Sequence, residues 1–156
     1  TIGVLEEIFG EQKYDVWVNK NHNHAIPKGG KWIHRKGATP AMKGERGVIP
    51  ANMRDGSYLV EGKGNSEFLW SSSHGAGRSL SRTDAKKKIS MTEFKDSMKG
   101  IVGTIDQGTL DEAPMAYKNI SKVMNAQKNS VKVIKHLKPI INMKGSSFRK
   151  FREKHY

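Results

Sequence analysis

The spacing of apolar side chains changes along the chain. In residues 14–18 the apolar side chains of Tyr14, Val16 and Val18 stand at alternate positions, while residues 31–38, 46–53 and 57–64 are short apolar runs bounded by glycine or proline. Alternation places every second side chain on one face of a strand, and glycine and proline mark strand ends. The first half is therefore predicted to consist mainly of short β-strands, with one more apolar segment at residues 67–73.

Helical spacing is found at the start of the chain and in its second half. The first ten residues carry apolar side chains three and four positions apart and end in Gly10, which predicts a helix. Residues 78–88 are a polar, basic helix candidate. Residues 90–102 combine an apolar stripe with Ser90 and Glu93 at the spacing of a capping box, which predicts a further helix.

The pattern returns to alternation near the C-terminus. Residues 115–129 place their apolar side chains on one helical face, whereas residues 130–145 alternate and contain Pro139 at an edge or break. Residues 145–156 form a basic tail with interleaved aromatics. Strands first and helices later, without a repeat, predict an α+β fold with a mixed β-sheet core and helices.

Composition narrows the class of partner. A length of 156 residues suits one domain, and 28 Lys and Arg against 15 Asp and Glu give a net charge of +13. Such an excess attracts polyanions, first nucleic acid and second an anionic membrane surface. The chain contains no cysteine, so it supplies neither a disulfide nor a thiolate metal ligand.

The sequence shows no targeting pattern. No apolar run approaches the roughly 20 residues of a transmembrane helix, and the N-terminus lacks the basic region and long apolar core of a signal peptide. We therefore expect a cytoplasmic protein with no membrane partner. Because the first residue is Thr1, we also expect the chain to be processed or to be part of a longer protein.

The first candidate site is SSSHGAGRSLSR, residues 71–82. A glycine-rich segment that enters a helix offers several N–H donors to a phosphate group. Arg78 adds a guanidinium that can bind two phosphate oxygens at once. His74 stands just before this cradle, where a neutral imidazole could attack phosphorus and form a phosphoramidate. The alternative is a tight turn with an exposed histidine.

Two basic segments upstream carry weaker signals. His22 and His24 in NHNHAIP suit a metal ion such as Mn or Zn, or an HNH-type nuclease core, and they are equally compatible with a polar loop. Residues 34–36, His-Arg-Lys before Gly37, place cations in series, as phosphate contacts require. The alternative for residues 34–36 is a solvated basic edge.

Two further segments could contact nucleic acid. Asn52, Asp55 and Ser57 are polar groups able to read a base edge, although an ordinary hairpin turn has the same composition. The basic tail could bind RNA through charge and stacking, or it could be a frayed, solvated end.

The order of these segments resembles one family. The stretches WIHRKGATPA, GVIPANMRDGSYLVEGKGN and LWSSSHGAGRSLSR, followed by EAPMAYKNI and KPIINMKG, are similar to the RtcB-type RNA-splicing ligase family. The similarity runs from about residue 14 to residue 145. It implies that residues 1–156 are the C-terminal part of an RtcB-like ligase domain.

The resemblance implies an enzyme that joins RNA 3′-phosphate or 2′,3′-cyclic phosphate ends to 5′-hydroxyl ends, with GTP and Mn²⁺ as cofactors. In that family a histidine attacks the α-phosphate of GTP and becomes guanylylated, and the GMP then passes to an RNA 3′-phosphate. Attack by the 5′-hydroxyl releases GMP, and a cyclic phosphate is opened beforehand. The implied RNA partners are tRNA halves or broken RNA ends, which agrees with the charge of +13.

The resemblance also implies roles for individual residues. His74 corresponds to the guanylylated histidine, Arg78 to a catalytic arginine, and Lys36 to a basic residue of the active site. His22 corresponds to a metal ligand, whereas the family usually has another residue type at His24. The implied nucleotide contacts, besides His74, are Asn23, Pro50, Ala51, Asn52, Met53, Ser57, Gly75, Ala76, Gly77 and Lys144.

The sequence departs from the family in two respects. Family members are much longer, and their N-terminal part supplies an Asp, a Cys and histidines to the metal and an Asn-rich loop to guanine. We therefore expect an N-terminal ligase half in cis or in trans as a partner, and an archease-like activator is a further candidate. Ala51 also stands where glycine is common. The alternative function is a non-catalytic, basic RNA-binding module derived from such a ligase.

Overall fold

Short strands dominate the first half of the chain, as the apolar pattern predicted. The computed structural model describes residues 2–144 except residues 12 and 15, so the predicted basic tail at 145–156 lies outside the described residues. The strands of this half are β1 (Asn23–Lys28), β2 (Lys31–Lys36), β3 (Ala38–Pro40), β4 (Arg46–Pro50), β5 (Ser57–Gly62) and β6 (Ser71–Ser73).

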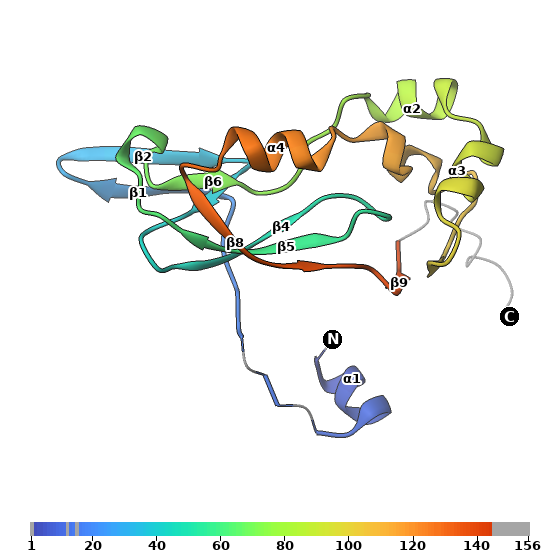
Figure 1. Ribbon diagram of the computed structural model, residues 1–156, viewed down its shortest axis with the longest axis horizontal. Helices are drawn as coiled ribbons and strands as arrows, with labels where there is room; N and C mark the ends of the chain where they lie inside the picture. Colours follow the sequence, from blue (N-terminus) through green and yellow to red (C-terminus); the bar gives the residue numbers. More distant parts are fainter. Residues whose placement is uncertain (1, 12, 15, 145–156) are drawn as a thin grey trace, which may run out of the picture.

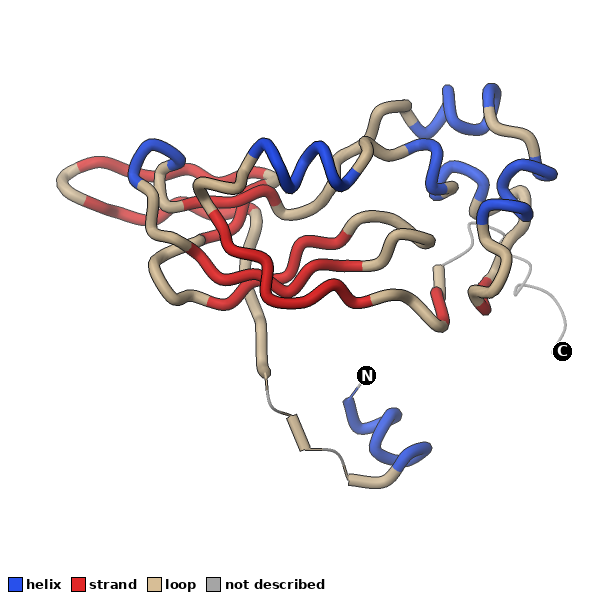
Figure 2. The backbone as a smooth tube through the Cα atoms, viewed as in Figure 1, coloured by secondary structure: helices blue, strands red, loops and turns tan. Residues whose placement is uncertain are grey.

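The strands form small sheets rather than one large sheet (Figure 2). β1 and β2 form an antiparallel hairpin, and β3 pairs with β6 in the same sense. β4, β5 and β8 (Val131–Leu137) form a three-stranded antiparallel sheet with β5 in the centre. A short parallel pair joins β7 (Val102–Gly103) to β9 (Ile141–Asn142). Together with the helices, this arrangement confirms the predicted α+β class.

Helices are concentrated in the second half (Figure 1). The capping box at Ser90 is confirmed, because Ser90 Oγ accepts from Glu93 N at 3.2 Å while Glu93 Oε2 accepts from Ser90 N at 3.0 Å. The α-helices are α1 (Ile2–Phe9), α2 (Arg82–Lys88), α3 (Met91–Ser97) and α4 (Ile120–Ala126). Three 3-10 helices are η1 (Ser66–Phe68), η2 (Leu110–Glu112) and η3 (Pro114–Ala116).

The strand predicted at residues 14–18 is wrong for the residues of this segment that the structure describes. Residues 14 and 16–18 have no strand assignment, and Trp17 is 65% exposed. Alternation alone does not make a strand, because the backbone groups of a strand also need a partner. Figure 1 shows this segment leading away from the sheets to α1, a helix with no buried residue.

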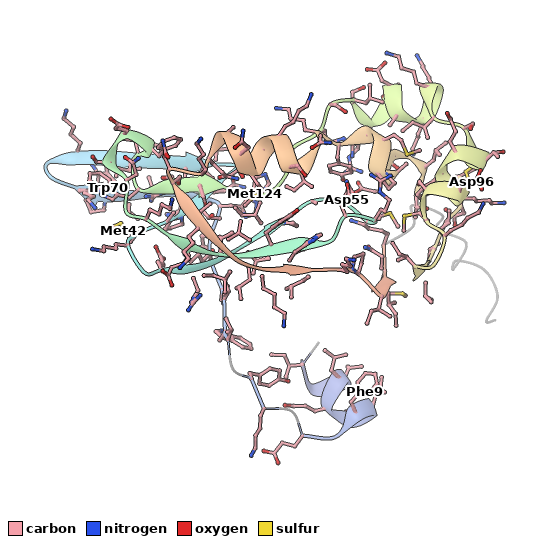
Figure 3. All side chains as sticks on the ribbon, in the orientation of Figure 1. Phe9, Met42, Asp55, Trp70, Asp96 and Met124 are labelled. Carbon is pink, nitrogen blue, oxygen red and sulfur yellow. The ribbon has the colours of Figure 1, made fainter. Side chains whose placement is uncertain are left out.

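Two hydrophobic clusters hold the fold together. The first lies between α4 and the three-stranded sheet and contains Ile49, Val60 and Met124, the last of which is labelled in Figure 3. The second surrounds the fully buried Phe94 of α3 and Met53 of the β4–β5 turn. The loop from β6 to α2 connects the two clusters, so packing at both ends fixes its path.

A candidate nucleotide-binding site

The loop that follows β6 is fixed by backbone hydrogen bonds to three segments. His74 N donates to Gly37 O at 3.2 Å, Ala76 N donates to Pro50 O at 2.9 Å, and Lys118 N donates to Gly77 O at 3.0 Å. Ala76 is buried in the first cluster. The predicted phosphate cradle is therefore a rigid loop pressed against the end of β4.

Glycine is required in this loop for two reasons. A Cβ at Gly75 would lie 3.1 Å from Pro50 O, which is tighter than an ordinary contact. Gly77 has φ +74°, a conformation that residues with a Cβ rarely adopt. Close approach and the positive φ together explain the Gly-Ala-Gly pattern after His74.

The imidazoles of His22 and His74 stack on each other. Their ring centroids are 4.9 Å apart and their planes differ by 7°. Gly37 joins the two residues, because its N–H donates to His22 O at 2.9 Å while its carbonyl accepts from His74 N. Partial burial and then the charge of His22 lower the pKa of His74 below its usual value. His74 is therefore mainly neutral at pH 7 and retains the electron pair that a nucleophile needs.

Replacing His22 with alanine is expected to raise the pKa of His74 toward the usual value of about 6.5. The substitution removes the neighbouring charge and also uncovers one face of the ring, and both changes favour protonation. An NMR titration of the imidazole C–H signals checks this, with exposed His34→Ala as the control. An unchanged pKa in His22→Ala would show that the stack does not tune His74.

A cavity of about 800 Å³ opens beside this loop. Its volume is in the range of pockets that bind small molecules and cofactors. Predicted site residues that line it come from the β4–β5 turn, the histidine loop and the C-terminal segment: Pro50, Ala51, Asn52, Met53, Ser57, His74, Gly75, Ala76, Gly77, Arg78 and Lys144. The structure therefore assembles most of the predicted nucleotide contacts around one space.

The β4–β5 turn uses its polar side chains internally. Asn52 Oδ1 accepts from Arg54 N at 3.0 Å and from Asp55 N at 2.8 Å, and Asn52 Nδ2 donates to Asp55 Oδ2 at 2.8 Å. The hydrogen bond from Arg54 is the main reason that the pKa of Asp55 is lowered, and burial opposes it. The hairpin-turn interpretation of Asn52 and Asp55 is supported, while Ser57 faces the cavity.

Arg78 anchors the loop and also lines the cavity. Its guanidinium donates to Leu80 O at 3.0 Å, to Asp111 O at 2.5 Å and to the hydroxyl of Tyr117 at 3.4 Å. Its Nη1 also lies 3.6 Å from Glu112 Oε1. Most of its donors are therefore engaged by the protein, and fewer remain for phosphate than its sequence position suggested.

Glu112 is a site residue that the sequence analysis missed. Its carboxylate accepts from the Tyr117 hydroxyl at 2.5 Å and pairs with Arg82 at 2.7 Å, Lys144 at 3.4 Å and Arg78. Burial acts to raise the pKa of Glu112, but the Tyr117 hydrogen bond and the charges of Lys144 and Arg82 outweigh it and lower the pKa. Burial and the bond to Glu112 raise the pKa of Tyr117 to about 12. Only the position of this acid at the start of the EAPMAYKNI stretch marked it in the sequence.

Three predicted residues do not line the large cavity. Asn23 and Lys36 face each other across the β1–β2 hairpin and are exposed. His22 lines a smaller cavity of about 280 Å³, which His74 and Lys20 also line.

Arg35 was predicted to belong to a phosphate-binding series. It is instead buried and donates to Ser71 Oγ at 2.8 Å, because alternation on β2 turns it inward.

The described residues do not form a complete metal site. Among residues 2–144, omitting 12 and 15, no group of three or more His, Cys, Asp or Glu side chains could hold an ion. Manganese sites in proteins favour several oxygen and nitrogen ligands in an octahedral shell. His22 and His74 alone do not fit such a shell, so the described residues offer at most part of one.

Comparison with known proteins identifies the family. The sequence model described as tRNA-splicing ligase RtcB matches residues 1–145, and the chain belongs to this family. The chain is 43% identical over 114 residues to the RNA-splicing ligase RtcB of Escherichia coli, which covers 73% of this chain and 28% of that protein. It is 34% identical over 166 residues to the tRNA-splicing ligase RtcB of Nanoarchaeum equitans, covering 90% of this chain and 35% of the relative.

The chain thus spans about a third of the length of the curated relatives it matches. Membership of a ligase family leaves the HNH-type interpretation of His22 and His24 without support. None of the helices in the described segments is long and apolar enough to cross a membrane.

Proposed function

We propose that this chain carries the nucleotide-attachment site of an RNA-joining ligase. His74 attacks the α-phosphate of GTP, a P–N bond forms as the bond to the β-phosphate breaks, and pyrophosphate leaves. The GMP passes from His74 to an RNA 3′-phosphate, and the 5′-hydroxyl of a second end displaces GMP as the phosphodiester forms. A 2′,3′-cyclic phosphate end is first opened by water. The observation that carries this proposal is the position of His74, which stacks on His22 at the edge of a nucleotide-sized cavity.

The residues around His74 suit the charge that develops during this reaction. The glycine-rich loop and the cations Arg78 and Lys144 line the cavity in which the phosphates would lie. Fixed donors of this kind stabilise a crowded, negatively charged phosphorus centre without having to reorganise. Lys36 lies on the exposed β1–β2 hairpin outside this cavity, and we propose that it serves as a third basic group toward the RNA end.

The proposed cofactors are GTP and Mn²⁺, and the chain alone does not complete the metal site. A divalent ion would neutralise phosphate charge, and His22 is the ligand that we propose from this chain. We propose that an N-terminal ligase part, in cis or in trans, supplies the other ligands. RNA is the proposed substrate, which agrees with the net charge of +13, and an archease-like activator is a further proposed partner.

Covalent labelling tests the proposal. The chain is incubated with Mn²⁺ and GTP labelled in its α-phosphate, alone and mixed with the N-terminal part of a family member, and the attachment site is mapped by mass spectrometry. GMP on His74 only in the mixture would mean that the site is completed in trans. No label in either sample would remove the catalytic proposal.

The second candidate function is a basic RNA-binding module without catalysis. The incomplete metal site within the described segments favours it for the chain in isolation. Such a module binds RNA with a steep salt dependence and is indifferent to GTP.

Replacing Lys144 with alanine is expected to weaken GTP binding about three- to tenfold, the range for one partly exposed charged contact. Lys144 lines the cavity next to Glu112, so its loss removes one cation from the nucleotide site. Titration calorimetry with GTP measures the effect, and Lys99→Ala, a surface lysine paired with Asp96, is the control. RNA affinity should change little, and equal losses for GTP and RNA would argue against a nucleotide role.

A further inference from the structure

A second cavity, of about 460 Å³, lies next to the nucleotide-sized cavity. Its walls come from the β4–β5 turn, the end of β8 and the start of α4. Polar and aromatic side chains dominate the lining: Arg54, Tyr58, Asn119, Ser121, His136 and Lys138. Asp55, which the sequence analysis named as a polar group able to read a base edge, lines it as well. The proposed attachment step uses none of these residues.

The cavity contains a preformed aromatic platform. The rings of Tyr58 and His136 stack with centroids 4.4 Å apart and planes differing by 8°. Tyr58 packs against the first hydrophobic cluster, and His136 Nε2 lies 2.7 Å from Asp55 O, in hydrogen-bond contact. The imidazole is therefore held on two sides, yet the residue remains exposed. A fixed, exposed ring is the surface on which an unpaired base stacks.

The charges around the platform suit a phosphodiester. The carboxylate of Asp55 is paired with Arg54 at 2.7 Å, so it does not repel an incoming anion strongly. Lys138 makes no hydrogen bond or ion pair with any residue that the structure describes, and its ammonium group is free to bind. The cavity therefore combines a ring for a base with a cation for the adjoining phosphate.

The position of this cavity connects it to His74. Lys138 and Pro139 line both cavities, and Asn52 and Asp55 stand on opposite sides of the same turn, one lining each space. Figure 3 labels Asp55 in the turn between β4 and β5. A chain bound at the platform would therefore run beside the cavity in which nucleotide attachment is proposed.

We propose that this second cavity binds one nucleotide of single-stranded RNA close to the end being joined, with its base on His136 and its phosphate at Lys138. The identification of the polymer as RNA rests on the proposed ligase function. The stacking platform and the position of Lys138 are observed in the structure and do not depend on the proposed function.

The test measures binding of a fluorescent, single-stranded RNA oligonucleotide by anisotropy. His136→Ala is expected to weaken binding about tenfold, which is the usual loss when one base–aromatic stack is removed. His136→Phe keeps the ring and should restore binding close to that of the parent. Lys99→Ala, which removes a surface lysine paired with Asp96, should have no effect. Thermal melts confirm that each variant is folded.

Two further binding measurements distinguish the contribution of the base from that of the phosphate. For an oligonucleotide with abasic positions throughout, His136→Ala should no longer matter. Lys138→Gln should lower the slope of log affinity against log salt by about 0.7, the value for one phosphate contact of a single strand. Equal binding by His136→Ala and the parent, or an equal loss with abasic RNA, would overturn the proposal.

The labelling of His74 distinguishes this proposal from the function on which it rests. His136 does not line the nucleotide-sized cavity, so His136→Ala should accept GMP as the parent does. Loss of RNA binding in His136→Ala without any labelling of the parent would support the RNA subsite and remove the ligase function. Normal labelling of His74 together with unchanged RNA binding in His136→Ala would support the ligase function and remove the RNA subsite.

Discussion

Replacing His74 with alanine is expected to abolish covalent attachment of GMP while leaving the fold intact. No other described side chain combines exposure, a lowered pKa and a place beside the glycine-rich loop, so no second nucleophile should replace it. The residue is exposed, and exposed substitutions usually change the free energy of unfolding by only about 0.5 kcal/mol. Labelling in the completed enzyme, with a thermal melt of each variant, measures both effects.

His34→Ala is the matched control for this experiment. It removes an exposed imidazole from β2, away from the cavity, and should retain full labelling. Label that persisted on the His74→Ala variant, at any residue, would remove the central assignment. Loss of label together with a strongly lowered melting temperature would mean that His74 acts through the structure and not as a nucleophile.

Replacing Gly56 with alanine is expected to have the largest effect on stability. Gly56 has φ +75°, and a Cβ there would overlap the Leu137 carbonyl oxygen and lie 3.0 Å from Pro139 Cδ. The left-handed backbone costs about 1–2 kcal/mol and the overlap about 1–3 kcal/mol more. Because the same turn carries Pro50–Met53, nucleotide binding should fall together with the melting temperature.

Gly44→Ala separates the two costs. Gly44 has φ +79°, but a Cβ there would meet nothing within 4 Å. Its melting temperature should therefore fall only through the backbone penalty, by about 2–8 °C for a domain of this size. Equal losses in the two variants would show that β8 moves freely away from the turn, contrary to the close packing at Leu137.

The predictable parts of the fold are those with strong local signals. The runs at β2, β4 and β5 are bounded by glycine or proline, and the Ser90 capping box is complete within four residues. Tyr14, Val16 and Val18 stand at alternate positions, but residues 14 and 16–18 pair with no strand that the structure describes, which a local pattern cannot reveal. α4 begins only at Ile120, because Asn119 caps it and Pro114 initiates a separate 3-10 turn.

The candidate site also contains residues that the sequence predicted and residues that it did not predict. The contiguous loop His74–Arg78 could be recognised from its residues, and the structure places it on the cavity. The partners of Arg78 could not, because Asp111 and Glu112 are more than 30 positions away in the sequence. For the same reason the Tyr58–His136 stack was not foreseen, since only the pairing of β5 with β8 makes these two residues cross-strand neighbours.

Glu112 stands among three cations of the candidate site. Arg78, Arg82 and Lys144 carry like charges that repel one another, and the Glu112 carboxylate contacts all three. The Glu112 carboxylate therefore supplies the negative charge that these cations would otherwise share with a bound anion. Under the proposed function, a phosphate that enters the cavity would have to compete with this carboxylate for the cations. The net charge of +13 would favour the arrival of polyanions, while the ion pairs of Glu112 would oppose the binding of a phosphate.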